Sequence, residues 1–537
     1  MSDDAVVRFL ADRGSYPHHP DAVEHVQTHI SHVFLAGPYV YKLKKAVRLP
    51  FLDFGSAERR HRYCLEEVRL NRRLSPAVYL DVLPIVRRPD GRLALGGDGE
   101  AVDHVVWMRR LPADRLLVNL VRTGRVTDEM IDALAMRLAT FHATAGEPET
   151  AVQADPEHLR ARWDENVRES AVFIGSLIRP EDHEVLVDFG PSFVRTHETL
   201  LRARQHGGRI REGHGDLQAG HVCFVDAPIP APGQPPLSPG IYVFDCIEFS
   251  AALRSNDIAY EAAFLAMDLE SLGHPELARR FVAAHAAAAN DPLAPILLPF
   301  FASHLAAVRG KVEGLKSMEP EVEPADRAAA AERARQRFAL AVRYAWNSQG
   351  PAVIACSGLS GSGKTVLAAE LADTTGFTLL ATDVLRKRRA TLSAATVGSY
   401  GRAGYSDAAR EAVYEVLCAE AARVLATGNG VVADATFIRR ADRGRLAAVA
   451  REHGRPLIFI ECQADEAVIR TRLEARLHTA PVSDARWEMY LAQRMRREPF
   501  ATDERSISVD TSAGIEEARC AAVRPLWRWR QGRWTGS

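Results

Sequence analysis

The residues whose chemistry is easiest to recognise form one uninterrupted segment, Gly358-Leu359-Ser360-Gly361-Ser362-Gly363-Lys364-Thr365. It matches the phosphate-loop pattern G-x-x-x-x-G-K-[ST] at every position, between an apolar run at 353–356 and a helix-forming run at 366–372. The glycines let backbone N–H groups turn inward on phosphate oxygens at the positive end of the following helix. Lys364 is expected to reach the terminal phosphates, and the Thr365 hydroxyl to ligate Mg²⁺. The segment therefore predicts a nucleoside triphosphate site.

Two apolar runs beyond this loop each end in a carboxylate. Residues 379–383 end at Asp383, and residues 430–434 end at Asp434. Ligand-contacting residues of doubly wound parallel sheets gather at the carboxyl ends of the strands. Asp434 is predicted to take part in the Mg²⁺ site, and Asp383 to be a catalytic residue that contacts the acceptor hydroxyl. The alternative for each is a helix cap.

A predicted helix farther along the chain carries Arg470, Arg472 and Arg476. A spacing of four residues places Arg472 and Arg476 on one face of this helix. Guanidinium groups there would close over the triphosphate and stabilise charge in the transition state. Arg472 and Arg476 are therefore candidate catalytic residues, and a solvated surface helix is the alternative.

The first half of the chain carries another pair of acidic residues around a predicted hairpin. Asp216 follows His214-Gly215 just before a short strand at 221–225, and Asp245 ends a strand at 241–245. The proline-rich stretch 227–240 between them is predicted to be a long exposed hairpin loop. Phosphoryl transfer to a hydroxyl needs one carboxylate to orient and deprotonate the acceptor and another to hold Mg²⁺ on the phosphates. Asp216 is assigned the first role and Asp245 the second.

This layout resembles the aminoglycoside phosphotransferase-like branch of the protein-kinase-like fold, whose catalytic loop reads H-G-D-L-H-x-x-N. The resemblance implies that Asp216 is the catalytic aspartate and Asp245 the metal-binding aspartate. His221 stands where that family has an asparagine that ligates a second Mg²⁺, so the resemblance places His221 in the metal site. Imidazole is a poor ligand for Mg²⁺ and a better one for Mn²⁺, so Mn²⁺ is the alternative metal.

The same resemblance assigns two residues near the N-terminus to nucleotide binding. Lys42, on a predicted strand, resembles the lysine that pairs with the nucleotide phosphates, and Glu67, on the following helix, resembles its ion-pair partner. Lys44 projects from the same strand face as Lys42 and is the alternative for that role.

Residues from about 350 to 515 resemble the small P-loop kinases that include chloramphenicol phosphotransferase, zeta-type toxins and polynucleotide kinase. The order of motifs carries this resemblance: the phosphate loop, T-D-V-L-R-K at 382–387, D-A-T-F at 434–437 and then the arginine-bearing helix. The two halves together resemble a bacterial fused family that joins a phosphotransferase-like domain to a P-loop kinase domain.

The elements that must position these residues are predicted to form three parts. The first is a bilobal, protein-kinase-like domain over 1–320, the second a helical connector over 321–348, and the third a P-loop domain over 349–537 with a parallel, doubly wound sheet. The fold class is therefore α/β together with α+β. A chain of 537 residues has ample length for two or three such cores.

The amino-acid composition restricts the kinds of partner that we expect for this protein and its location. Lys and Arg number 68 against 69 for Asp and Glu, so bulk charge favours neither nucleic acid nor an anionic membrane. Apolar runs are too short to span a membrane, and the acidic start is not that of a signal peptide. Seven dispersed cysteines without a C-x-x-C pair indicate reduced thiols and a cytoplasmic location.

These observations lead to a hypothesis of an ATP- and Mg²⁺-dependent phosphotransferase acting on a hydroxyl of a small molecule, sugar-like or aminoglycoside-like, with a second ATP site in the P-loop domain. One alternative makes the first domain a catalytically weak module that senses a ligand and regulates the second. Another makes the P-loop domain a polynucleotide-type 5′-hydroxyl kinase. The sequence predicts neither the acceptor nor the oligomeric state, because acceptor pockets are built from poorly patterned helices and loops.

Overall fold

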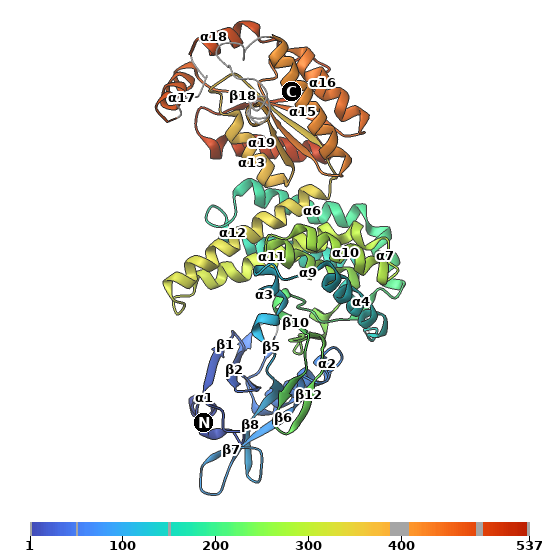
Figure 1. The fold of residues 1–537 in the computed structure, drawn as a ribbon, viewed down its shortest axis with the longest axis vertical. Helices are drawn as coiled ribbons and strands as arrows, with labels where there is room; N and C mark the ends of the chain where they lie inside the picture. The colour runs from blue at the N-terminus through green and yellow to red at the C-terminus, as the bar shows by residue number, and fades with distance from the viewer. Residues whose placement is uncertain (1–2, 50–51, 149–151, 387–406, 480–486, 534–537) are drawn as a thin grey trace. The chain divides into compact units, whose positions relative to one another are not determined.

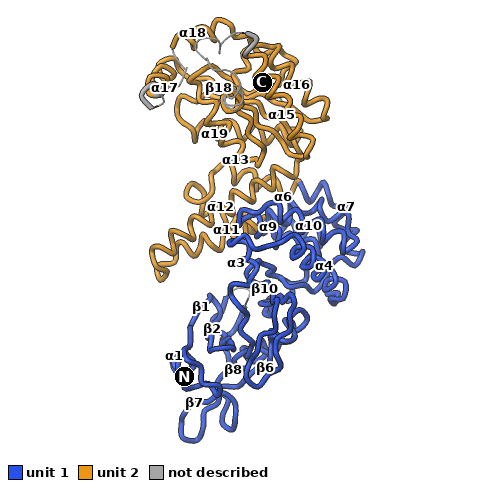
Figure 2. Tube along the Cα trace, in the orientation of Figure 1, with its two compact units in different colours: residues 1–163, 193–305 blue, residues 164–192, 306–537 orange. Residues whose placement is uncertain are grey.

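The computed structural model describes residues 3–49, 52–148, 152–386, 407–479 and 487–533. They divide into unit 1, residues 1–163 and 193–305, and unit 2, residues 164–192 and 306–537 (Figures 1 and 2). These units differ from the predicted boundaries, because residues 164–192 and 306–320 belong to unit 2. Contacts between residues distant in sequence define the units, whereas the division into functional domains stays a prediction.

Unit 1 contains a six-stranded antiparallel sheet in the order β1-β2-β3-β8-β6-β7. The strands are β1 (Val23–Gln27), β2 (Ser31–Ala36), β3 (Tyr39–Lys44), β6 (Tyr79–Arg87), β7 (Leu93–Leu95) and β8 (Glu100–Arg109). Helix α2 (Ala57–Asn71) contacts β6 and β8, and the Ser56 hydroxyl caps it by accepting the Arg59 N–H. Because side chains alternate along β3, Tyr41 and Leu43 enter one core cluster while Lys42 and Lys44 project from the opposite face.

Short strands and helices complete unit 1. Strand β9 (Ile210–Glu212) pairs with β14 (Ser255–Asp257), and β10 (Val222–Val225) pairs with β13 (Gly240–Val243). Helix α10 (Pro275–Ala288) packs against α4 (Asp128–Thr144) and α9 (Ile258–Ser271). Further elements of unit 1 are α1 (Asp3–Ala11), β4 (Arg48–Leu49), β5 (Leu52–Asp53), α3 (Leu117–Arg122), α7 (Glu198–His206) and α8 (Ala251–Arg254). Three helices include residues of both units: α5 (Pro156–Ser170), α6 (Pro180–Thr196) and α11 (Ala294–Met318).

The proline-rich stretch predicted to be a loop carries a small hairpin of its own. Strands β11 (Ile229–Ala231) and β12 (Gln234–Leu237) pair there with an irregular register. Gly233, with a φ of 69°, supplies the left-handed residue of the turn. Prolines are tolerated because a two-stranded ribbon consists of edges, where an N–H group can be missing from the ladder.

Unit 2 is built on a five-stranded parallel sheet in the order β16-β17-β15-β18-β19. The strands are β15 (Val353–Ser357), β16 (Thr378–Ala381), β17 (Val431–Asp434), β18 (Leu457–Gln463) and β19 (Ser506–Asp510). The helices are α12 (Pro324–Asn347), α13 (Lys364–Thr375), α15 (Asp407–Ala426), α16 (Arg440–Glu452), α17 (Glu466–Thr479), α18 (Trp487–Arg496) and α19 (Ile515–Arg530). Helix α12 covers most of the predicted connector and contacts α13. Both parts of the predicted fold class are therefore confirmed.

A buried arginine ties distant parts of unit 2 together. Arg519 of α19 is 1% exposed and pairs with Glu181 and, at 2.7 Å, with Asp182, both on α6. It also donates to the Thr374 hydroxyl at the end of α13, 2.9 Å away. Residues 164–192 belong to unit 2 because contacts of this kind hold them there.

No helix in the described part of the chain combines the length and the apolar character needed to cross a membrane.

Candidate active sites

The phosphate loop joins β15 to α13, as its motif predicts. Gly358, Gly361 and Gly363 have φ angles of 152°, 86° and 80°, in a region that glycine adopts without strain. Lys364 is the first residue of α13, so the loop amides and the helix N-terminus converge. A Cβ atom at Gly361 would lie 2.9 Å from Ile469 Cγ2, so glycine there also lets α17 approach the loop. The backbone of this loop therefore has the shape that the predicted phosphate site requires.

Helix α17 brings one of the two predicted arginines to this loop. Arg472 donates to the Thr511 carbonyl at 2.6 Å and, more weakly, to the Gly361 carbonyl at 3.4 Å. Arg476 lies on the same helix, but its side chain is outside the described residues. Arg470 instead stacks over the Trp487 ring, 4.4 Å from its centroid. Arg472 therefore lies beside the phosphate loop, and its role in catalysis stays a prediction.

A side chain from α18 also contacts the loop. The Ser360 N–H donates to Gln493 Oε1 at 2.8 Å, so a carboxamide oxygen occupies one donor of the predicted phosphate-binding backbone. Leu359 packs on a small apolar cluster that includes Ile469 and Tyr490. Sequence reasoning missed Gln493, because a lone glutamine on a surface helix carries no pattern.

The predicted carboxylates of unit 2 have different surroundings. Asp434 ends β17, is 4% exposed and lies in register with Cys356 of β15, so its backbone reaches the sheet edge from which the phosphate loop leaves. Asp383 lies in a helical turn after β16, is largely exposed and pairs with Arg386 at 3.1 Å. This arrangement suits Asp434 for a protected site near the loop, whereas Asp383 faces solvent.

In unit 1, three residues predicted from distant parts of the sequence meet. Lys42 Nζ lies 2.8 Å from Glu67 Oε1 and 2.5 Å from Asp245 Oδ1. Burial alone would raise the pKa of Asp245, but Lys42 and then His221 hold it well below its ordinary value. Burial would lower the pKa of Lys42, and the two carboxylates raise it well above the usual value instead. The site therefore holds Lys42 as a cation and Asp245 as an anion.

The second lysine of the strand has a different partner set. Lys44 Nζ contacts Glu67 Oε2 at 2.6 Å and forms an ion pair with Glu248, and the Lys44 side chain is inaccessible to solvent. Only Lys42 of the two contacts Asp245, which favours the assignment of Lys42 to the nucleotide phosphates. Each of the two carboxylate oxygens of Glu67 thus pairs with a different lysine.

A buried glutamate holds the loop that carries Asp216. The Glu261 carboxylate on α9 accepts the N–H groups of His214 and Gly215 at 2.8 and 2.7 Å. Gly215 has a φ of 84°, which turns the chain so that Asp216 follows. His214 Nε2 lies 2.8 Å from the Phe244 carbonyl, so the imidazole also helps to hold this loop. Sequence reasoning missed Glu261, although an acidic residue in the apolar run of α9 was a usable signal.

His221 lies between Asp216, the predicted catalytic carboxylate, and Asp245, the predicted metal ligand. Its Nδ1 is 2.8 Å from the Asp216 carbonyl oxygen, which can only accept, so Nδ1 carries a proton. Its Nε2 lies 3.6 Å from Asp245 Oδ2. In the neutral ring, Nε2 therefore presents its lone pair on the side of Asp245, as a metal ligand would.

The backbone at Asp245 is strained. Its φ of 64° is in the left-handed region, which is uncommon for a residue other than glycine. The Tyr79 hydroxyl accepts the Asp245 N–H at 3.0 Å, and Asn71 Oδ1 accepts the next N–H, of Cys246, at 2.9 Å. Such conformations persist where the surroundings over-determine them, commonly at functional sites.

Across the described ranges, no three or more His, Cys, Asp or Glu side chains are grouped as a ready-made metal site. Mg²⁺ is usually held by one or two carboxylates together with substrate phosphates and water, so a dense protein cage is not required. Asp245 with His221 in unit 1, and Thr365 with Asp434 in unit 2, are donor sets that fit this pattern. Their roles as ligands stay predictions.

The fold and the two sites define a two-part protein. One unit brings together Lys42, Glu67 and Asp245, with Asp216 on the other side of His221, and the other is a P-loop unit. Residues 353–500 match a family model described as an AAA domain. An uncharacterized protein of Mycobacterium tuberculosis (strain H37Rv) is 32% identical over 510 residues, covering 94% of this chain and 95% of that protein. The chain belongs to the same family as this mycobacterial protein.

Two solved structures resemble parts of the chain. A choline/ethanolamine kinase family protein from Mesorhizobium loti covers 63% of this chain and 98% of its own, with 12% identity and a TM-score of 0.37. A gluconokinase from Sinorhizobium meliloti covers 34% of this chain and 95% of its own, with 20% identity and a TM-score of 0.26. Both are described as kinases.

Proposed function

We propose that the chain is an ATP-dependent phosphotransferase that moves the γ-phosphate to a hydroxyl group of a small molecule, sugar-like or aminoglycoside-like, with a second ATP site in the P-loop unit. The contact between Lys42 and Asp245 carries this proposal. It places the cation expected at the phosphates beside the carboxylate expected at the metal, and Asp216 lies across His221 from that pair. Few structural roles require two acidic residues, a buried lysine and a strained backbone at one point.

The proposed transfer in unit 1 assigns one task to each side chain. Lys42, oriented by Glu67, binds phosphate oxygens. The acceptor oxygen forms a bond to the γ-phosphorus while the bond from that phosphorus to the β–γ bridging oxygen breaks, and its electron pair leaves with ADP. Asp216 accepts the proton of the acceptor hydroxyl. Mg²⁺, held by Asp245, supplies charge neutralisation at the phosphates when it is bound.

The P-loop unit supports a second nucleotide site by different means. Its donors are backbone N–H groups and Lys364, with Arg472 beside the loop and Asp434 at the sheet edge. Thr365 follows Lys364 and supplies the hydroxyl for Mg²⁺. Gln493 occupies the Ser360 N–H, so nucleotide binding there includes replacing one hydrogen bond with another.

His221 favours a second candidate function for unit 1. An imidazole at the place of a hard oxygen ligand weakens Mg²⁺ binding. Unit 1 would then bind nucleotide, turn it over slowly and regulate the P-loop unit.

The test follows label from radioactive ATP into a panel of sugars and aminoglycosides, using the full chain. The matched proteins are wild type, Asp216→Asn, Lys364→Ala and the double variant. We expect labelled product with wild type and with Lys364→Ala, and background levels with the double variant. Transfer that requires Lys364 but not Asp216 would support the regulatory candidate instead, and product from the double variant at the wild-type rate would refute both.

A further inference from the structure

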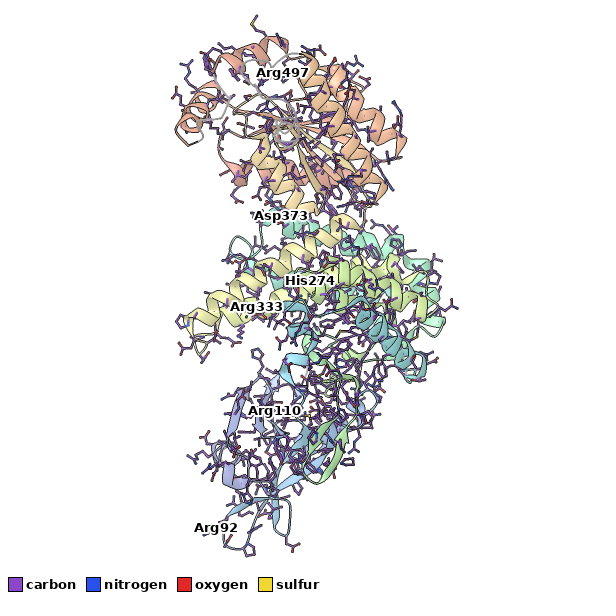
Figure 3. All side chains as sticks on the ribbon, in the orientation of Figure 1. Arg92, Arg110, His274, Arg333, Asp373 and Arg497 are labelled. Atoms are coloured by element: carbon purple, nitrogen blue, oxygen red, sulfur yellow. The ribbon has the colours of Figure 1, made fainter. Side chains whose placement is uncertain are left out.

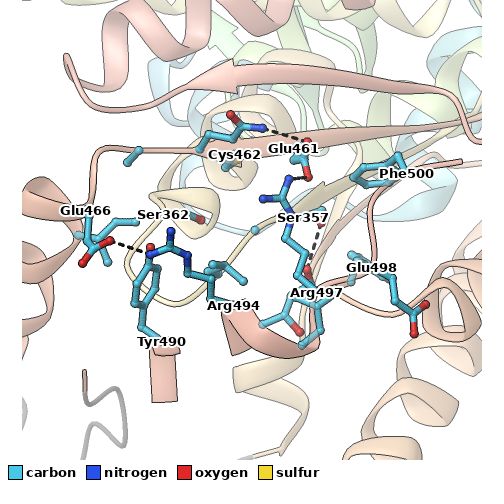
Figure 4. A pocket seen from close by; sticks show the side chains of 18 of the residues that line it. Ser357, Ser362, Glu461, Cys462, Glu466, Tyr490, Arg494, Arg497, Glu498 and Phe500 are labelled. Carbon is cyan, nitrogen blue, oxygen red and sulfur yellow. Dashed lines mark hydrogen bonds and ion pairs between the residues drawn. The ribbon is translucent and has the colours of Figure 1, made fainter. Parts of the chain in front are cut away.

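A cavity of about 310 Å³ lies beside the phosphate loop in unit 2 (Figure 4). Its walls come from the start of the loop, the carboxyl end of β18, the segment after β17 and helix α18. This volume is within the range of small-molecule pockets. The position, next to backbone that is shaped for phosphates, is where a second substrate of this unit would meet the nucleotide.

One polar group in the cavity wall has no partner. Ser362 is 2% exposed, and its hydroxyl makes no hydrogen bond with any residue that the structure describes. A Cβ atom at Gly358 would lie 2.4 Å from this oxygen, so the glycine leaves the space that the hydroxyl needs. A buried hydroxyl without a partner costs free energy, which a ligand or water in the cavity would recover.

The charged groups of the wall are paired with each other. Arg497, labelled in Figures 3 and 4, forms an ion pair with Glu461, and Arg494 Nη1 lies 2.7 Å from Glu466 Oε2. Each guanidinium has five N–H groups and each carboxylate about four lone pairs, so these pairs retain donors and acceptors for a ligand. They retain little net charge.

Arg443, the third arginine of the wall, has no N–H group to spare. Its two contacts with Glu504 (2.7 and 2.9 Å) and three with backbone carbonyls (3.0 to 3.1 Å) use all five donors. Asp465 and Glu498 also line the cavity and have no cationic partner among the described residues. The wall is therefore neutral to negative, with an aromatic ring from Tyr490.

We propose that this cavity binds an uncharged, hydroxyl-rich small molecule as the second substrate of the P-loop unit, and that it disfavours anions. The carboxylates of these pairs accept hydrogen bonds from the ligand's hydroxyls, and the guanidinium groups donate to them. The Ser362 hydroxyl gains a partner, and Tyr490 packs on the carbon skeleton. The proposal rests on the proposed function only in treating the ligand as a substrate. It disfavours the polynucleotide alternative, because a nucleic-acid end brings several negative charges to this wall.

Binding is measured on the full chain without nucleotide, by ligand-observed NMR. The probes are neutral sugars and sugar alcohols, each paired with its carboxylate counterpart, and a 5′-hydroxyl oligonucleotide. We expect neutral members to bind at least about fivefold more tightly than their carboxylates, the effect of one unit charge at a partly exposed site. Tighter binding of a carboxylate or of the oligonucleotide, or no binding of any neutral probe, would overturn the proposal.

Two variants test the charge argument directly. Glu461→Gln leaves Arg497 unpaired, so the preference should shift towards the carboxylate probes; Arg497→Gln should shift it the other way. Glu420→Gln is the control, because it removes a similar ion pair, 2.7 Å from Arg423, on α15 away from the cavity. Equal preferences in all three variants and wild type would refute the assignment. Since no nucleotide is present, this result is independent of whether phosphate transfer occurs.

Discussion

The two candidate sites reach the same chemistry through different parts of the chain. In unit 2, eight consecutive residues form the predicted phosphate site, mainly through backbone N–H groups whose directions the glycines set. In unit 1, the site consists of side chains from Lys42 to Asp245, held by the shared carboxylate of Glu67. In the predicted backbone site, the N–H donors and Lys364 all lie within one loop. The side-chain site depends on the packing of several elements at once.

The sharpest test of this difference is Lys364→Ala. Lys364 is the one side-chain cation within the loop, so its loss should lower nucleotide turnover by unit 2 by about a thousandfold or more while unit 1 still binds ATP. Turnover and equilibrium binding of a fluorescent ATP analogue measure the two effects. Lys311→Ala, which removes a lysine paired with Glu169 on the surface, is the control. Loss of both binding sites in Lys364→Ala would mean that the sites are not separate.

The corresponding change in unit 1 is Asp216→Asn, made in the Lys364→Ala background. Removal of a positioned base should lower phosphoryl transfer at least about a hundredfold with little change in ATP binding. Single-turnover transfer to the accepted hydroxyl compound is the measurement. Asp226→Asn, at an exposed aspartate paired with Arg115, should leave the rate near that of the parent. Unchanged transfer in Asp216→Asn would remove Asp216 from the mechanism.

Acid should destabilise unit 1 through His285, and this third expected effect is of moderate size. His285 is 1% exposed and 3.0 Å from His142, and burial, followed by the proximity of His142, lowers its pKa from 6.5 to about 3. Above pH 6.5 His285 is neutral in both the folded and the unfolded protein, so it does not lower the free energy of unfolding. As the pH drops from 6.5 towards 3, the unfolded protein binds a proton that the folded protein does not, and the free energy of unfolding falls. At pH 5 the loss from this residue is about 2 kcal/mol, or about thirtyfold in the folding equilibrium.

Urea unfolding at pH 7.5 and pH 5 measures this effect. His285→Asn is expected to lose less stability on acidification than wild type, even if it starts less stable. His274→Gln replaces a more exposed histidine and should lose as much stability as wild type when the pH is lowered (Figure 3). An equal loss in all three proteins would show that His285 does not carry the proton uptake.

The smallest expected effect concerns the metal in unit 1. If His221 Nε2 ligates the metal, Mn²⁺ should support more activity than Mg²⁺, by about fivefold, and His221→Asn should restore preference for Mg²⁺ and raise the rate. Rates with both ions, for wild type and variant in the Lys364→Ala background, give the comparison. Identical metal responses would mean that His221 matches the family asparagine in position only.

The difference between the sites also determines what could be predicted from sequence. The phosphate loop was predictable because all its determinants are local. Asp216 and Asp245 were predictable because each lies in a short segment next to a strand, and Lys42 with Glu67 because of the resemblance. Glu248 and Gln493 were not predicted, because their roles come from contacts that only the folded chain creates. Glu261 was missed, although its place in the apolar run of α9 was a usable signal. Contacts that form only on folding also place residues 164–192 in unit 2, whereas the sequence predicted one uninterrupted first domain over 1–320.

Arg519 has a consequence for how the protein is made. Asp182 is synthesised early, and the arginine that neutralises it lies 337 residues later in the chain. At about 5–20 residues per second, the ribosome takes tens of seconds to cover that interval. During this time the acidic pair on α6 has no Arg519 to bind, so this part of unit 2 completes its packing only after α19 has been synthesised. A chain cut after residue 320 would lack Arg519, so Glu181 and Asp182 would lose this ion-pair partner for good. The two halves are therefore best studied in the intact protein.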